Sequence, residues 1–149
     1  GGPGRVRVIA VPRHYKTLNG SMFKARALNY SAELRRRLGL DKPDVWVYFM
    51  DEESVVGEDT VLGIVDFIEN MRGLIGQGLI VYSNYWGRNL IASIADSIRA
   101  FADVSTYAFQ IRHGFVPWMH GSHVLVRADI EAKVGWDFGS VLGCENCVA

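Results

Sequence analysis

The chain has 149 residues, of which 49% are apolar and 21% are charged. That is enough to bury the core of one ordinary domain, and it excludes an intrinsically disordered chain. Sixteen basic and sixteen acidic residues cancel, so no overall charge favours nucleic acid or an anionic membrane surface. No apolar run reaches the roughly 18 residues of a membrane-spanning helix. We therefore expect one globular domain over residues 1–149, with no nucleic-acid partner.

In chain order, the first predicted element is a strand over residues 5–12, an apolar run closed by a proline. A helix is predicted over 22–38, because apolar side chains recur there every three or four residues and Gly39 supplies a stop. Residues 44–50 predict a second strand. A second helix is predicted to begin at residue 55 or 57 and to end at 71.

The second half of the chain continues the alternation. Residues 78–84 predict a third strand and 90–102 a third helix. Shorter strand candidates follow at 107–112 and 123–127, with a last helical piece at 128–135. Alternating strands and helices favour an α/β fold with a largely parallel or mixed sheet. In such sheets ligands bind beyond the carboxyl ends of the strands.

Three carboxylates follow the strand predicted at 44–50, in the stretch VYFMDEES. Asp51 and Glu53 are two residues apart, so in extended chain both point to the same side. Two such carboxylates repel each other unless a cation or hydrogen-bond donors compensate them. A hard divalent ion such as Mg²⁺ or Mn²⁺ takes oxygen ligands and can share them with a diphosphate. The alternative is that these acids cap the following helix, whose first turn favours negative charge.

The two cysteines, Cys144 and Cys147, form a single CENC motif. A structural zinc ion needs four ligands, and the sequence has no second pair of cysteines. The helix-opening context of a thioredoxin-like motif is also missing. We therefore interpret the motif as two reduced thiols.

Five groups of segments occur in order along nearly the whole chain: VPRHYKTLNGSMFKARALNYSAELRR, MDEESVVGEDTVLGIVDFI, GQGLIVYSNYW with ADSIR, HGSHVLVR, and VGWDFGSVLGCEN. Together they resemble the inverting glycosyltransferases of family 2, in particular the egghead-like β-1,4-mannosyltransferase branch. The resemblance implies a GT-A-like fold, a Rossmann-like mixed sheet flanked by helices. It also implies a metal-dependent transferase that moves a sugar from a nucleotide-sugar donor, GDP-mannose or a UDP-sugar, to a lipid or glycan acceptor.

The resemblance further implies a donor site. Asp51 and Glu53 of DEES would bind Mn²⁺ or Mg²⁺ together with the nucleotide diphosphate. Lys24 and Asn29 of KARALNY would line the donor pocket. From the residues alone, Lys24 is interpreted as an exposed helix charge and Asn29 as a helix-surface amide.

On the acceptor side, HGSHVLVR resembles the segment that precedes the acceptor site. It implies His120, Gly121 and Ser122 as contacts for the acceptor or the donor. Tyr85 and Trp86 offer flat aromatic faces to a sugar, and packing in the core or at its rim is the alternative interpretation.

The family's catalytic base is an acidic pair, typically Glu-Asp, which takes the proton of the acceptor hydroxyl. The corresponding pair here is Glu145 and Asn146. An amide takes no proton at neutral pH. Either Glu145 serves as the base, which is the role we assign to it, or the register of the motif shifts, or catalysis is crippled. One alternative is a noncatalytic glycosyltransferase-like remnant or subunit that needs a partner chain. A third hypothesis is a plain α/β binding domain with acidic helix caps.

Family members begin with a further nucleotide-binding strand, to which nothing in residues 1–20 corresponds, and they continue into membrane segments. The resemblance therefore implies the middle of a catalytic domain, from a membrane-associated parent whose catalytic domain is cytoplasmic. An incomplete sheet has open edges, so we expect self-association. With no signal sequence or spanning segment, the chain itself is expected to be soluble.

Overall fold

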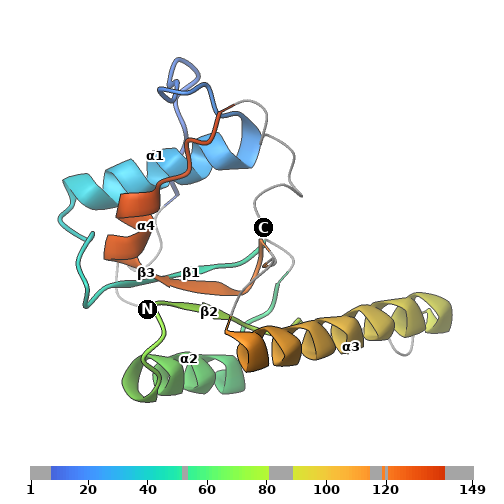
Figure 1. Cartoon of the computed structure of the whole chain (residues 1–149). Coiled ribbons are helices and arrows are strands. Elements are labelled where there is room, and N and C mark those ends of the chain that lie inside the picture. The colour runs from blue at the N-terminus through green and yellow to red at the C-terminus, as the bar shows by residue number, and fades with distance from the viewer. Residues whose placement is uncertain (1–7, 52–53, 81–88, 115–118, 120, 140–149) are drawn as a thin grey trace. The chain divides into compact units, whose positions relative to one another are not determined.

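The computed structural model describes residues 8–51, 54–80, 89–114, 119 and 121–139. Across these residues the chain forms four helices and three strands. The predicted α/β class is confirmed, because helices and strands alternate along most of the described chain (Figure 1).

The chain divides into two compact units. The first comprises residues 1–47 and 126–148, and the second comprises residues 48–125. The chain leaves the first unit within β1 (Trp46–Phe49) and returns to it within β3 (Val124–Arg127). Both strands were predicted from their apolar runs.

The first unit contains α1 (Phe23–Arg37) and α4 (Ala128–Val134), which lie side by side (Figure 1). Gly39 follows α1 with a φ of +67°, a left-handed backbone that favours glycine, as the predicted helix stop requires. Gly135, with a φ of +70°, ends α4. Both helices are therefore confirmed within about one residue of their predicted bounds.

A buried ion pair joins these two helices. Glu131 of α4 is 5% exposed, and its carboxylate binds the guanidinium of Arg35 on α1. The indole N–H of Trp136 donates to the same carboxylate at 2.8 Å. Because a buried carboxylate without partners is costly, these contacts fix α4 on α1.

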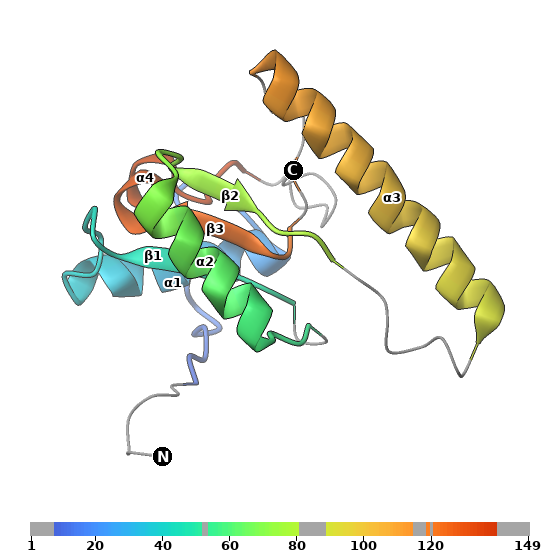
Figure 2. The ribbon, with the colours of Figure 1, turned by 90° about the horizontal axis from the view of Figure 1, so that it is seen from below.

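The second unit contains α2 (Glu58–Asn70), β2 (Ile75–Gln77) and α3 (Leu90–His113). Figure 2 shows α2 next to β2. The ring of Phe67 lies so close to Gly76 that a methyl group added there would stand 3.1 Å from it. The glycine therefore allows α2 to approach the strand closely.

The three described strands form one sheet in the order β1-β3-β2. Val45, just before β1, accepts the N–H of Ala128, just after β3, at 2.9 Å. The N–H of Gly78, just after β2, donates to the carbonyl of His123, just before β3, at 2.8 Å. In each pair the beginning of one strand meets the end of the other, so the strands run antiparallel.

Two predicted strands differ from the structure. The described residues 8–12 lie in no strand, and Val8 is 95% exposed. An apolar run alone does not make a strand, because extended chain also needs a neighbour for its backbone hydrogen bonds. For the third strand, predicted at 78–84, the structure has β2 at 75–77 and no strand at 78–80, and residues 81–84 lie outside the described residues. The pairing of β2 with β3 ends at the bond from Gly78 to His123, where the chain of β3 turns.

The strand predicted at 107–112 is wrong, because α3 continues through it to His113. The stretch is rich in β-prone side chains, but no glycine or proline interrupts residues 90–113. Gly114, with a φ of +69°, ends the helix, and the side chain of Asn89 begins it by accepting the N–H of Ala92. None of the described helices has both the length and the apolar character needed to cross a membrane.

Candidate functional site

A turn after β1 brings together two of the predicted site residues in the second unit. The backbone N–H of Asp51 donates to Oγ of Ser122 at 3.1 Å, although the residues are 71 positions apart. Oγ of Ser54 lies 3.4 Å from the same hydroxyl. Asp51 is half-buried and Ser122 is 4% exposed. The DEES and HGSH motifs therefore meet at this point.

His123 holds the turn that presents Ser122. Its φ of +58° lies in the left-handed region, which strains a residue with a side chain. Its ring Nδ1 shares a hydrogen bond with the hydroxyl of Tyr48, and the side chain of Gln77 donates to the carbonyl of Ser122 at 3.0 Å. Contacts from both neighbouring strands thus keep His123, which is 8% exposed, in this conformation.

The position of α2 tests the alternative that the acids of DEES cap the following helix. The helix begins at Glu58, after an N-cap at Gly57 that makes no side-chain cap. The acids in its first turn are Glu58 and Asp59. Asp51 lies seven residues before this helix, so its carboxylate does not cap it.

A hard divalent cation such as Mg²⁺ or Mn²⁺ prefers oxygen ligands, and Asp51 brings a half-buried carboxylate to this strand end. Glu53, the second predicted ligand, lies outside the described residues. Among the residues that are described, no three His, Cys, Asp or Glu side chains gather into a metal-binding group.

Lys24 and Asn29, the predicted donor contacts of the first unit, lie on α1. Lys24 is exposed in the first turn. The amide of Asn29 donates to the hydroxyl of Tyr15 at 2.8 Å and to Glu33 at 3.0 Å, and its oxygen accepts the N–H of Trp136 at 3.4 Å. Asn29 is therefore a node in a polar network rather than a simple surface amide.

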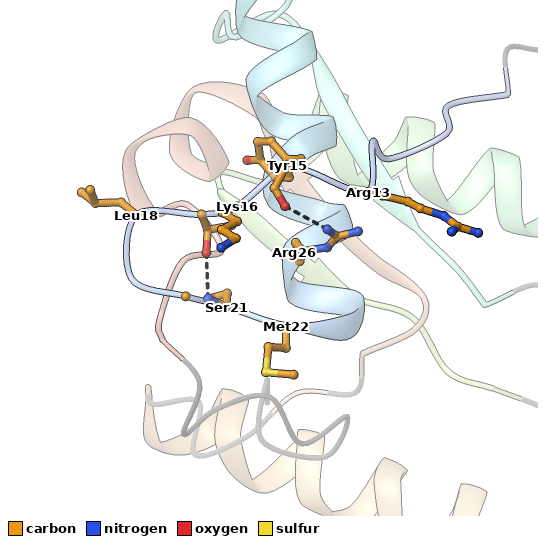
Figure 3. Close-up of a pocket in the computed structure, with 9 residues that line it drawn as sticks. Arg13, Tyr15, Lys16, Leu18, Ser21, Met22 and Arg26 are labelled. Atoms are coloured by element: carbon orange, nitrogen blue, oxygen red, sulfur yellow. Dashed lines mark hydrogen bonds between the residues drawn. The ribbon is translucent and has the colours of Figure 1, made fainter.

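A cavity of about 340 Å³ lies in the first unit, between the loop at residues 13–22 and the start of α1 (Figure 3). Three of its nine lining residues are basic and none is acidic. The lining residues are Arg13, Tyr15, Lys16, Thr17, Leu18, Gly20, Ser21, Met22 and Arg26.

Asp137 fastens the loop that forms this cavity. Its carboxylate accepts the backbone N–H of Asn19 at 2.7 Å and the hydroxyl of Ser21 at 2.8 Å, and the amide of Asn19 donates to its carbonyl at 2.8 Å. Burial alone would raise the pKa of the Asp137 carboxyl, but hydrogen bonds from Asn19, Thr17 and Ser21 outweigh it and lower the pKa below its ordinary value. The carboxylate stays charged and acts as a clamp.

Gly121 is exposed and directly precedes Ser122. The remaining predicted site residues lie outside the described residues, as does the CENC motif. They are Glu53, Tyr85, Trp86, His120 and Glu145.

Sequence reasoning did not select Tyr48, His123 or Asp137 as parts of a site. His123 belongs to the HGSH motif, so that motif held a signal for it. No local pattern points to Tyr48 or Asp137, because their partners lie 75 and 116 to 118 positions away.

Comparison with known proteins agrees with the motifs. A family profile described as glycosyl transferase family group 2 matches residues 46–142. The β-1,4-mannosyltransferase bre-3 of Caenorhabditis elegans is 35% identical over 138 residues, and the β-1,4-mannosyltransferase egh of Drosophila melanogaster is 36% identical over 138 residues. No solved structure matches the chain.

Each alignment covers 91% of this chain but 30% of the relative, so the chain spans less than a third of the length of these relatives. The family profile matches more than half of the chain, including the Asp51 turn and the HGSH segment. The chain therefore belongs to glycosyltransferase family group 2, and within it resembles the egghead-like β-1,4-mannosyltransferases.

Proposed function

We propose that this chain is the central part of a GT-A-like catalytic domain that transfers mannose, with inversion, from a nucleotide-sugar donor to a lipid or glycan acceptor. The observation that carries the proposal is the 34–36% identity to three β-1,4-mannosyltransferases along 91% of the chain. The bond from Asp51 to Ser122 supports it, because it joins the motifs for which metal and acceptor roles were predicted. GDP-mannose is the proposed donor, with a UDP-sugar as the alternative.

In this proposal Asp51 and Glu53 hold Mn²⁺ or Mg²⁺. When bound, such a cation stabilises the negative charge of a departing diphosphate. The protein's own part is to keep Asp51 in place at the strand end. The buried hydroxyl of Ser122 does so by accepting the backbone N–H of Asp51.

On the donor side, the exposed Lys24 in the first turn of α1 would contact a phosphate oxygen. Asn29 would support the wall of the donor pocket, because its amide already bonds Tyr15, Glu33 and Trp136.

On the acceptor side, Gly121 and Ser122 would orient the sugar together with His120 and Trp86. Glu145 would take the proton of the acceptor hydroxyl as its oxygen attacks the anomeric carbon and the bond to the diphosphate breaks. Attack from the face opposite the diphosphate inverts the configuration at that carbon.

Calorimetric titration of GDP-mannose and of UDP-glucose into the chain, with and without Mn²⁺, tests the donor site. We expect Mn²⁺-dependent binding that Asp51→Asn abolishes. Asp59→Asn is the matched control, because it removes the same charge from an exposed position on α2. Equal binding by the two variants would contradict the metal site. No donor binding by a folded wild-type chain would support the noncatalytic remnant instead.

A further inference from the structure

The cavity in the first unit carries a concentration of positive charge that the chain as a whole does not. Arg13, Lys16 and Arg26 line it, whereas the net charge of the chain is zero. The described residues place no carboxylate in an ion pair with any of the three. Like charges around one cavity repel each other, and a bound anion would relieve that repulsion.

The N-terminus of α1 adds to the positive charge of the cavity. Ser21 and Met22 line the cavity, and α1 begins at the next residue, Phe23. The N-cap Met22 makes no side-chain cap, and the first turn holds no acidic residue. Helix N-termini carry partial positive charge on backbone N–H groups that point outward, so this end favours the same sign of ligand as the three basic side chains.

The carboxylate of Asp137 hydrogen-bonds to Ser21 of the cavity lining, and its single negative charge offsets only part of the charge of the three basic residues. Asp137 directs its carboxylate at Asn19 and Ser21, whose donors it accepts at 2.7 and 2.8 Å. The N–H of Ser21 also donates to Oγ1 of Thr17 at 2.7 Å, which closes the turn at Gly20. These bonds hold the loop in one conformation, and such preorganisation lowers the cost of binding.

The basic side chains of the cavity have more N–H donors than the one hydrogen bond from Arg26 to Tyr15 uses. Arg26 uses one terminal nitrogen to bond the carbonyl of Tyr15 at 2.9 Å, as Figure 3 shows. A guanidinium has five N–H donors and matches phosphate oxygens in pairs. Lys16 adds an ammonium with three further donors.

We propose that this cavity is a binding site for a phosphate group, and that it binds without a metal ion. At about 340 Å³ it lies at the small end of ligand pockets, which suits a phosphate or diphosphate better than a whole nucleotide sugar. The phosphate group of a nucleoside diphosphate and free phosphate share the chemistry that this site recognises. All its lining residues belong to the first unit, and the proposal needs neither Asp51 nor a cation, so it can be tested separately from the proposed metal site.

The test is a calorimetric titration of the intact chain with pyrophosphate, GDP and guanosine, in EDTA. The double variant Arg13→Gln/Lys16→Gln removes two exposed cations from the cavity and leaves the partly buried hydrogen bond from Arg26 to Tyr15 in place. The matched control is Arg112→Gln/Lys133→Gln, which removes the same two residue types from exposed positions on α3 and α4. Thermal unfolding verifies that each variant is folded.

We expect pyrophosphate and GDP to bind, guanosine not to bind, and the cavity variant to lose about tenfold or more in affinity, as charge-assisted hydrogen bonds predict. Equal affinities for pyrophosphate and GDP would assign the site to free phosphate, and tighter GDP binding would assign it to a nucleotide. Either result supports the proposal.

Equal losses in the two double variants, binding of guanosine as tight as that of GDP, or no binding of pyrophosphate to the folded wild type would overturn it. Asp51→Asn separates the two proposals. It should keep metal-free pyrophosphate binding even where it loses Mn²⁺-dependent donor binding, and loss of the metal-free binding would place the phosphate outside the cavity.

Discussion

The backbone N–H of Asp51 donates to the hydroxyl of Ser122 across 3.1 Å, and Ser122 is 4% exposed. The bond links the end of β1 to the turn before β3, in the same direction as the antiparallel pairing of the two strands. The hydroxyl of Ser122 thus continues the hydrogen bonding between β1 and β3 beyond the end of β1. It holds the backbone of Asp51, the residue whose carboxylate is the proposed metal ligand.

Replacing Ser122 by alanine should therefore lower the free energy of unfolding by about 1–2 kcal/mol, because the N–H of Asp51 loses its acceptor in a partly buried place. Urea denaturation measures this. Ser105→Ala is the control, since that hydroxyl is exposed and bonds only within α3, and it should change stability by less than about 0.5 kcal/mol. Equal effects of the two substitutions would show that the Ser122 bond contributes nothing special.

The Tyr48 hydroxyl should hold His123 in its strained conformation. Burial raises the pKa of Tyr48, so its hydroxyl is protonated at neutral pH and is able to hydrogen-bond to Nδ1 of His123. Tyr48→Phe should cost about 1 kcal/mol of unfolding free energy and shift the NMR resonances of the His123 ring. If the ring resonances stay in place, the hydrogen bond does not position His123.

Glu131→Gln should be strongly destabilising, by about 3 kcal/mol, because it leaves the guanidinium of Arg35 partly buried without its counter-charge. Arg37→Gln is the control, since Arg37 is 73% exposed and 3.9 Å from Glu33, and it should cost less than about 0.5 kcal/mol. Chemical denaturation of both variants decides the matter. A small loss for Glu131→Gln would mean that α4 is held by packing alone.

Alkaline pH should destabilise the second unit through Tyr107. Burial, with the charge of Asp103 as a second cause, raises the pKa of Tyr107 to about 12. In the unfolded chain the phenol loses its proton near pH 10. The stabilisation is therefore complete below about pH 10 and disappears as the pH rises from there towards 12.

Urea denaturation at pH 9 and pH 11.5 measures this effect. Tyr107→Phe has no proton to lose, so its stability should fall less between the two pH values than that of the wild type. An identical fall in both proteins would show that Tyr107 does not contribute to the pH dependence.

The helices were the most predictable part of the fold. Two sequence signals agree for α1 and α4: the spacing of the apolar residues predicts each helix, and Gly39 and Gly135 predict where each helix ends. The strand predicted at 107–112 is wrong because the strand preference of its residues is weak. Without a glycine or proline to stop it, α3 continues through this stretch. The apolar run at 78–84 did not give the position of the third strand. The position of β2 depends on its pairing with β3, whose chain turns at His123.

The candidate site was predictable only in part. Asp51 and Ser122 belong to local motifs, so both can be identified from the sequence alone. Their contact does not follow from any local pattern, because it joins positions 71 apart. The clamp from Asp137 to Asn19 is also long-range, at 118 positions, and the basic cavity that it shapes follows from that contact.

The central claim is inverting mannosyl transfer, and NMR spectroscopy of the product tests it most directly. The chain, supplied with GDP-α-mannose, Mn²⁺ and a glycan acceptor, should yield a product whose new anomeric signal has the β configuration. Glu145→Gln should greatly reduce its formation. A product with the α configuration, or no product from a chain that binds the donor, would contradict the proposed function.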